Sequence, residues 1–75
     1  KIKFELASNS FVKLKIYDVL GREKAVLIND NQTAGEHEVI FNAKGLSSGI
    51  YFYKLEANGA NGSQYSATKK MILIK

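Results

Sequence analysis

Residues 45–55 have the sequence GLSSGIYFYKL, which contains the clearest turn and strand signals of this chain. Its two glycines and two serines favour a turn, and the aromatic and β-branched residues that follow at once favour a strand. A tyrosine just after such a turn can bury its ring and donate its hydroxyl to the backbone upstream, an arrangement called a tyrosine corner. Tyr51 is the candidate for this residue.

Further strands are predicted on both sides of this stretch. Residues 1–6 and 11–18 alternate apolar and polar side chains, with Val12, Leu14 and Ile16 facing the core. The polar turn at 7–10 predicts that these two strands form a hairpin. Residues 24–29, 36–42 and 64–75 also have strand character, and polar loops are predicted at 29–35 and 58–63.

The number and spacing of these segments predict the fold class. Six to seven short strands are separated by turn signals, and no segment has helical periodicity. This pattern favours an all-β fold, an antiparallel immunoglobulin-like β-sandwich, with a small barrel as the alternative. A length of 75 residues is enough for one domain.

Composition argues against several kinds of partner. The net charge is +4, but ten of the eleven basic residues are lysines, many of them alternating with apolar residues along strands. A nucleic-acid-binding surface favours arginine and a clustered basic stripe, so we expect no nucleic-acid partner. The chain has no cysteine and therefore no disulfide or thiolate metal site, and no apolar run is long enough for a transmembrane helix.

One turn is predicted to be structural. At residues 18–23, Gly21 can adopt a positive φ, the Asp18 carboxylate can accept hydrogen bonds from backbone amides of its own turn, and Arg22 can pair with Asp18. We expect Asp18, Gly21 and Arg22 to shape this turn rather than to take part in catalysis.

No constellation for catalysis or for a cofactor is apparent. The loop at 29–35 has oxygen ligands that calcium could use, but Asp30 is its single carboxylate. His37 is the only histidine, without a neighbouring nucleophile motif or partner ligands, and is expected to cap the end of the core face. We therefore predict no enzyme activity, no catalytic residues, no cofactor and no metal site.

Two apolar features have alternative readings. Ile50 and Phe52 have the parity of an outer face, where a loop could cover them or they could form a contact patch. Residues 69–75 end the chain as a lysine-bracketed run around Met71 to Ile74. Such a run is typical of a strand buried on both faces, or of a strand that offers one face to a partner.

In their order and spacing, several segments resemble a known family. They are Ile2 to Phe4, Val12 to Glu23, Ala34-Gly35 leading into Val39 and Phe41, Leu46 to Tyr53, and Thr68 to Lys75. The chain resembles the type A C-terminal sorting domains of the type IX secretion system of Bacteroidetes and their relatives. It is more loosely similar to the immunoglobulin-like domain of the flagellar hook-capping protein.

The resemblance implies a non-catalytic sorting domain spanning residues 1–75, without the family's extreme N-terminal segment. It would direct a larger cargo protein through the periplasm and the outer-membrane translocon, for secretion or cell-surface attachment. The residues that the resemblance assigns to recognition are Gly49, Ile50, Tyr51, Lys70, Met71, Ile72, Leu73, Ile74 and Lys75. One alternative is a self-associating immunoglobulin-like structural module that forms an oligomer or an extracellular filament through its edge strands or terminal strand. Another is an ancillary ligand-binding module that uses Tyr17 or Phe52.

Overall fold

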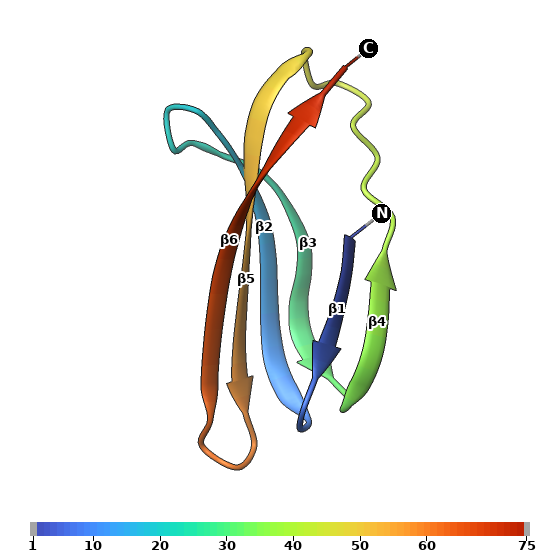
Figure 1. Ribbon diagram of the computed structural model, residues 1–75, viewed down its shortest axis with the longest axis vertical. Coiled ribbons are helices and arrows are strands. Elements are labelled where there is room, and N and C mark those ends of the chain that lie inside the picture. The colour runs from blue at the N-terminus through green and yellow to red at the C-terminus, as the bar shows by residue number, and fades with distance from the viewer. Residues whose placement is uncertain (1, 75) are drawn as a thin grey trace.

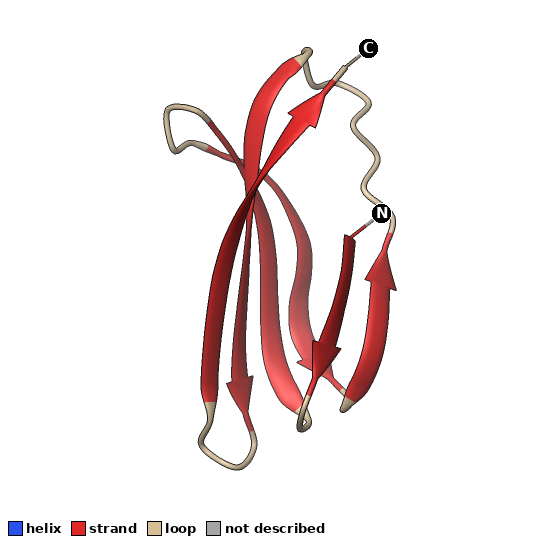
Figure 2. Ribbon diagram, in the orientation of Figure 1, coloured by secondary structure: helices blue, strands red, loops and turns tan. Residues whose placement is uncertain are grey.

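The computed structural model describes residues 2–74 and consists, in that range, of six β-strands joined by loops, as Figure 2 shows. The strands are β1 (Ile2–Leu6), β2 (Ser10–Asp18), β3 (Glu23–Gln32), β4 (Gly35–Val39), β5 (Gly49–Gly59) and β6 (Gln64–Leu73). Four form an antiparallel sheet in the order β3-β2-β5-β6, and β1 pairs with β4 in a smaller antiparallel sheet (Figure 1). The two sheets pack as a sandwich, so the predicted all-β class is confirmed. Lys1 and Lys75 lie outside the described residues.

The core lies between the sheets, and the middle of β2 contributes its most buried side chains. Val12, Leu14 and Ile16 are 0% exposed. Buried side chains from β1 and β5 pack against them, and these are Ile2, Leu6, Tyr51, Leu55 and Ala57. The predicted inward parity of β2 and β5 is therefore confirmed.

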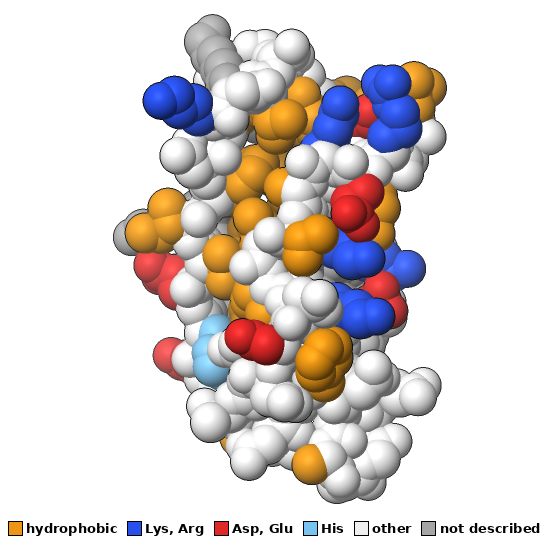
Figure 3. Space-filling model, turned by 180° about the vertical axis from the view of Figure 1, so that it is seen from behind, with side chains coloured by type: hydrophobic (Ala, Val, Ile, Leu, Met, Phe, Trp, Pro, Cys, Tyr) orange, Lys and Arg blue, Asp and Glu red, His pale blue; other side chains and the backbone are white. Residues whose placement is uncertain are grey.

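The smaller sheet is too narrow to cover the larger one completely. Several hydrophobic side chains pack against the core but stay only half-buried, among them Leu27, Ile28, Val39 and Phe41. On the face shown in Figure 3, hydrophobic side chains reach the surface in a band down the middle of the molecule.

The predicted hairpin between the first two strands is wrong. β1 pairs with β4, whereas β2 pairs with β3 and β5 in the other sheet. The short link between β1 and β2 crosses between the sheets and is tied to two other turns. The Asn9 carbonyl accepts a hydrogen bond from the Ala60 amide at 2.8 Å, and Asn9 Oδ1 accepts one from the Ala34 amide at 2.8 Å.

β3 is longer and less regular than predicted. It extends to Gln32, so residues 29–32 are strand and not part of a loop. Register shifts opposite β2 leave Lys24 and Leu27 without a facing partner, which makes them β-bulges. The bulge at Leu27 lets Leu27 and Ile28 both pack against the core, which accounts for an apolar run that lacks alternation.

Three other predicted boundaries shift. The strand predicted over 36–42 is β4, which ends at Val39, and Phe41 follows it in an irregular connection. The loop predicted over 58–63 is shorter, because Asn58 and Gly59 belong to β5 and Asn58 lies opposite Gln64. The last strand ends at Leu73 and forms an edge of the larger sheet.

Candidate recognition surface

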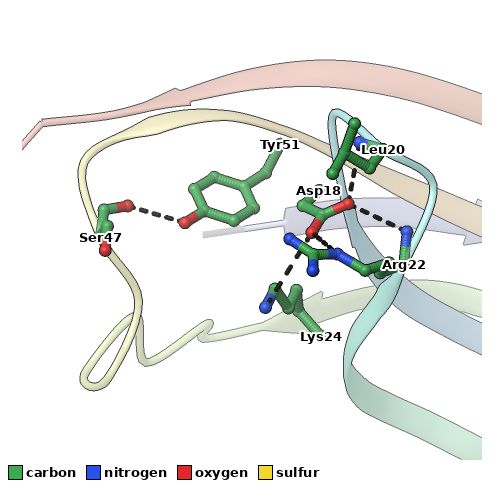
Figure 4. A network of polar contacts seen from close by, with 6 residues as sticks. All are labelled: Asp18, Leu20, Arg22, Lys24, Ser47 and Tyr51. Atoms are coloured by element: carbon green, nitrogen blue, oxygen red, sulfur yellow. Dashed lines mark hydrogen bonds and ion pairs between the residues drawn. The ribbon is translucent and has the colours of Figure 1, made fainter.

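The turn before β5 ends in a tyrosine corner. The chain reverses at residues 43–46, where the Leu46 amide donates to the Ala43 carbonyl at 3.0 Å. The Tyr51 hydroxyl then donates a hydrogen bond to the Ser47 carbonyl at 2.8 Å (Figure 4). The Tyr51 ring is part of the core and only 7% exposed. Tyr51 therefore fastens the irregular connection from β4 to the start of β5.

Replacing Tyr51 with phenylalanine tests how much the hydrogen bond to Ser47 contributes to stability. The variant keeps the buried ring but leaves the Ser47 carbonyl without its donor, so we expect the free energy of unfolding to fall by about 1 kcal/mol. Urea denaturation followed by circular dichroism measures the change. Tyr17→Phe on the outer face of β2 is the matched control and should change stability little; equal effects of the two substitutions would contradict the corner.

A second turn, at residues 18–23, lies at the same end of the sandwich. Asp18 is directly opposite Tyr51 in the register of β2 and β5. One carboxylate oxygen of Asp18, Oδ1, accepts hydrogen bonds from the Leu20 and Arg22 amides, both at 2.9 Å. The other, Oδ2, accepts one from Arg22 Nε at 2.8 Å (Figure 4). Gly21 supports the turn with a φ of +82°, which a residue with a Cβ rarely adopts.

These contacts change the acidity of Asp18. The hydrogen bond from the Arg22 amide holds the pKa of the Asp18 carboxyl below its usual value, and the Arg22 side chain and the Leu20 amide act in the same direction. Burial opposes them by disfavouring the charged form. Lys24 Nζ adds a weaker ionic contact with Oδ2 at 3.9 Å. The carboxylate is therefore the anionic centre that organises the turn.

This shift predicts a pH-dependent stability. Because the folded-state pKa of Asp18 is lowered, its stabilising contribution is complete above the ordinary aspartate value of about 3.9 and is lost as the pH falls through the lowered value. We expect Asp18→Asn to unfold at a lower urea concentration than the parent at pH 7, with the gap narrowing in acid below about pH 3.9. Asp30→Asn, in the exposed part of β3, is the control. A gap that does not depend on pH would contradict this role of Asp18.

The residues that the family resemblance assigns to recognition come from two paired strands. Gly49, Ile50 and Tyr51 of β5 lie opposite Leu73, Ile72 and Met71 of β6, respectively, and Lys70 lies opposite Phe52. Ile74 follows β6 and is 85% exposed. The structure therefore brings all of them except Lys75, which lies outside the described residues, to one end of the larger sheet.

These residues divide between the two faces of the sheet. Tyr51 and Met71 face the core, and Leu73 packs against it. Ile50 and Ile72 point outward and are 39% and 65% exposed. The terminal apolar run is thus not buried on both faces, which was one of the two readings of its sequence.

An apolar patch forms on the outer face at this end. Half-buried Phe52 and Tyr17 lie side by side on β5 and β2, next to the directly opposed pair Ile50 and Ile72. We call these four residues, Tyr17, Ile50, Phe52 and Ile72, the outer-face patch. The sequence predicts which face of its strand each of these side chains lies on. It does not predict the strand pairing that brings the four side chains together.

Lysines lie along one side of the outer-face patch. Lys70 lies opposite Phe52, and Lys15 and Lys54 form the next row of the sheet. Lys15 Nζ lies 3.1 Å from Glu23 Oε1, and the hydrogen bond to Glu23 raises the pKa of Lys15. Lys54 Nζ lies 3.7 Å from Glu56 Oε1, so the border of the patch carries both lysines and glutamates.

His37 has a structural position. It is half-buried and stacks on Phe4 of the neighbouring strand with ring centroids 5.2 Å apart. Its Nε2 lies 2.6 Å from the Thr33 carbonyl oxygen, and because a carbonyl only accepts, this nitrogen carries a proton. Within residues 2–74, no group of three or more His, Cys, Asp or Glu side chains could hold a metal ion.

Comparison with known proteins identifies a family. The model of the family described as secretion system C-terminal sorting domain matches residues 1–75. Searches of the curated proteins and of the solved structures found no significant match. The part of the chain that the structure describes contains no helix long and apolar enough to cross a membrane.

Proposed function

The chain belongs to the secretion system C-terminal sorting domain family, and on this premise we propose that it directs its cargo through the type IX outer-membrane translocon by presenting β6 and the outer-face patch. Domains of this family are non-catalytic sorting signals for type IX secretion and are parts of larger cargo proteins. The cargo is accordingly secreted or displayed at the cell surface.

The main support for this recognised surface is the position of Ile50 and Ile72. The two side chains are directly opposed, outward-facing and exposed, and they lie on the last two strands of the larger sheet. Among the described strands, β6 pairs only with β5, so one backbone edge is open to a partner. An added strand would gain main-chain hydrogen bonds along this edge, while alternate side chains provide specificity.

The buried residues of the same segment have a supporting role in this proposal. Tyr51 and Met71 lie opposite each other on the inner face and hold the ends of β5 and β6 against the core. Asp18, directly opposite Tyr51 on β2, fixes the adjacent turn. The translocon would then contact the outer face, and these residues would stabilise the conformation of that face.

Substitution of the exposed pair tests the proposal. In a reporter carrying this domain in a host with a working type IX system, the double variant Ile50→Thr, Ile72→Thr should leave the reporter in the periplasm. Threonine keeps the β-branched shape, so thermal unfolding should change little. Val26→Thr is the matched control, because Val26 is outward-facing on β3 and 48% exposed.

The control should be secreted like the parent. Normal export of the double variant would exclude Ile50 and Ile72 from the recognised surface without affecting the family assignment. Loss of export together with a lower unfolding temperature would assign the pair to stability instead.

The open edge of β6 also supports a second candidate function, self-association through edge strands. Two copies of the chain could pair along this edge and extend the sheet. Light scattering over a range of concentrations distinguishes the two functions. A strictly monomeric chain at high concentration would exclude self-association.

A further inference from the structure

The end of the larger sheet that lies away from the outer-face patch carries a row of side-chain amides around one aromatic ring. Phe11 of β2 lies opposite Asn31 of β3 on one side and opposite Asn58 of β5 on the other, and Asn58 lies opposite Gln64 of β6. Directly opposed residues share a face of the sheet, so this row crosses all four strands on the outer face. Both polar segments that the sequence predicts as loops contribute an asparagine to it.

The Phe11 side chain is accessible to a ligand. It is 36% exposed, and among the described residues it is not one of the hydrophobic side chains that form the core or pack against it. An open cavity of about 310 Å³ lies at this end of the sheet, with Phe11, Asn31 and Asn58 in its wall. Sites for small molecules have volumes of about 300–1,000 Å³, so this cavity has room for a small ring compound.

Hydrogen bonds between turns fix the rim of this cavity. The Asn9 carbonyl accepts a hydrogen bond from the Ala60 amide, and Asn9 Oδ1 accepts one from the Ala34 amide, both at 2.8 Å. Asn9 and Ala60 both line the cavity. The side chains of Asn31 and Asn58, in contrast, have no hydrogen-bond partner among the described residues, so their donors and acceptors are available to a ligand.

The charge of the lining restricts the class of ligand. No charged side chain among the described residues lines the cavity, and the lowest part of the molecule in Figure 3 shows no acidic or basic side chain. Phosphate and carboxylate ligands are bound best by cationic groups, and metal ions prefer several carboxylates. A purely apolar ligand would leave the amides of Asn31 and Asn58 without partners. The lining therefore fits a neutral ligand that has an apolar face and several hydroxyl groups.

We propose that this end of the larger sheet binds a neutral carbohydrate, with one sugar ring stacked on Phe11 and its hydroxyl groups bound by Asn31 and Asn58. The C–H groups on one face of a pyranose are slightly positive, and the face of an aromatic ring is negative, so the two attract each other. Each carboxamide has an acceptor oxygen and a donor NH₂ group, so it can bind two neighbouring hydroxyl groups.

This carbohydrate site is independent of the sorting surface. Phe11 lies opposite Asn58, near the last residues of β5, whereas Ile50 and Phe52 of the outer-face patch lie near its first residues. A cargo at the cell surface or in the medium encounters neutral carbohydrate from two sources, the surface polysaccharide of its own cell and polysaccharides of the surroundings. Both sources offer the same chemistry to the site.

A titration of the isotope-labelled chain, followed by NMR, tests the proposal. The probes are cellobiose, mannobiose and chitobiose for external polysaccharides, and neutral oligosaccharides released from the host's own surface polysaccharide for the other source. We expect a dissociation constant on the order of millimolar for at least one probe, because the site is open and the ligand is small. The signals that shift should be those of Phe11 and of the side-chain amides of Asn31 and Asn58. The probe that binds identifies the source.

Two pairs of variants place the sugar at this site. Phe11→Leu removes the ring but keeps an apolar side chain, and Phe52→Leu makes the same change at the other end of the outer face. Asn31→Ala removes an amide of the site, and Asn29→Ala removes an amide that lies one row away on the same face of β3. We expect the first member of each pair to weaken binding about threefold or more, and the second to leave it unchanged. Thermal unfolding of each variant verifies that it is folded.

Three results would overturn the proposal. The first is the absence of shifts with every probe at about 20 mM, a concentration well above the expected dissociation constant. The second is binding that Phe11→Leu and Asn31→Ala leave unchanged, or shifts confined to Tyr17 and Phe52. The third is tighter binding of glucose 6-phosphate than of any neutral probe, because the site would then recognise an anion. None of these results bears on export of the cargo.

Discussion

Replacing Leu14 with alanine should lower the free energy of unfolding by about 2–5 kcal/mol. Leu14 is in the middle of β2, is 0% exposed and belongs to the core between the two sheets. A chain of this length has a total stability of roughly 4–11 kcal/mol, at about 0.05–0.15 kcal/mol per residue. The substitution therefore removes a large share of the stability, and the urea concentration at the midpoint of unfolding should fall accordingly.

Urea denaturation at 25 °C measures this effect, and Lys13→Ala is its control. Lys13 is the preceding residue of β2 and its side chain is exposed, so its replacement should change stability by less than about 0.5 kcal/mol. Similar losses in the two variants would contradict the central position of β2 in the core.

Deletion of Lys70 to Lys75 should abolish export of a reporter that carries the domain. The deletion removes the part of β6 that lies opposite Gly49 to Phe52, including Ile72 of the outer-face patch. It also removes Met71 and Leu73, which pack against the core. The reporter should accumulate in the periplasm, as measured by its activity in fractionated cells.

The deletion could block export by removing recognised residues or by unfolding the domain, and a second variant distinguishes these two causes. Replacing Ile72 alone with threonine keeps Met71, Leu73 and the β5–β6 ladder in place. If the translocon binds the exposed residues, this variant should fold like the parent and be exported less. Full export of the deletion itself would contradict any role of the terminal strand in sorting.

Local chemistry made the two turns predictable from the sequence. The bonds of Tyr51 to Ser47 and of Asp18 to Arg22 each join residues four positions apart, so the residue types and their spacing are sufficient to suggest them. The inward faces of β2 and β5 were predictable for a similar reason, because alternation along one strand depends on burial of one face.

Pairing between strands was not predictable in the same way. The alternation in residues 1–6 shows which side chains face the core, but it does not show that β1 pairs with β4 instead of β2. The hydrogen bonds of Asn9 to Ala34 and Ala60 decide the path of the link, and they join residues far apart in sequence. The outer-face patch depends on the same long-range register.

Irregular backbone explains the remaining differences. In β3 the bulges at Lys24 and Leu27 interrupt the alternation of side chains. The residues of the apolar run at 25–28 that face the core therefore cannot be assigned from the sequence pattern. The polar residues at 29–32 continue the strand because Asn29 to Gln32 pair with Lys13 to Ser10 of β2. Pairing along an edge strand tolerates such polar side chains, although their sequence is typical of a loop.

The claim that this chain is a type IX sorting signal is tested by the location of a periplasmic reporter fused to the intact domain, residues 1–75 preceded by the adjoining segment of its cargo. The reporter is measured in the medium, at the cell surface and in the periplasm of two hosts, one with a working type IX system and one with an inactivated translocon. A C-terminal sorting signal predicts export in the first host and periplasmic retention in the second. Retention of the intact fusion in both hosts, or equal export from both, would contradict the claim.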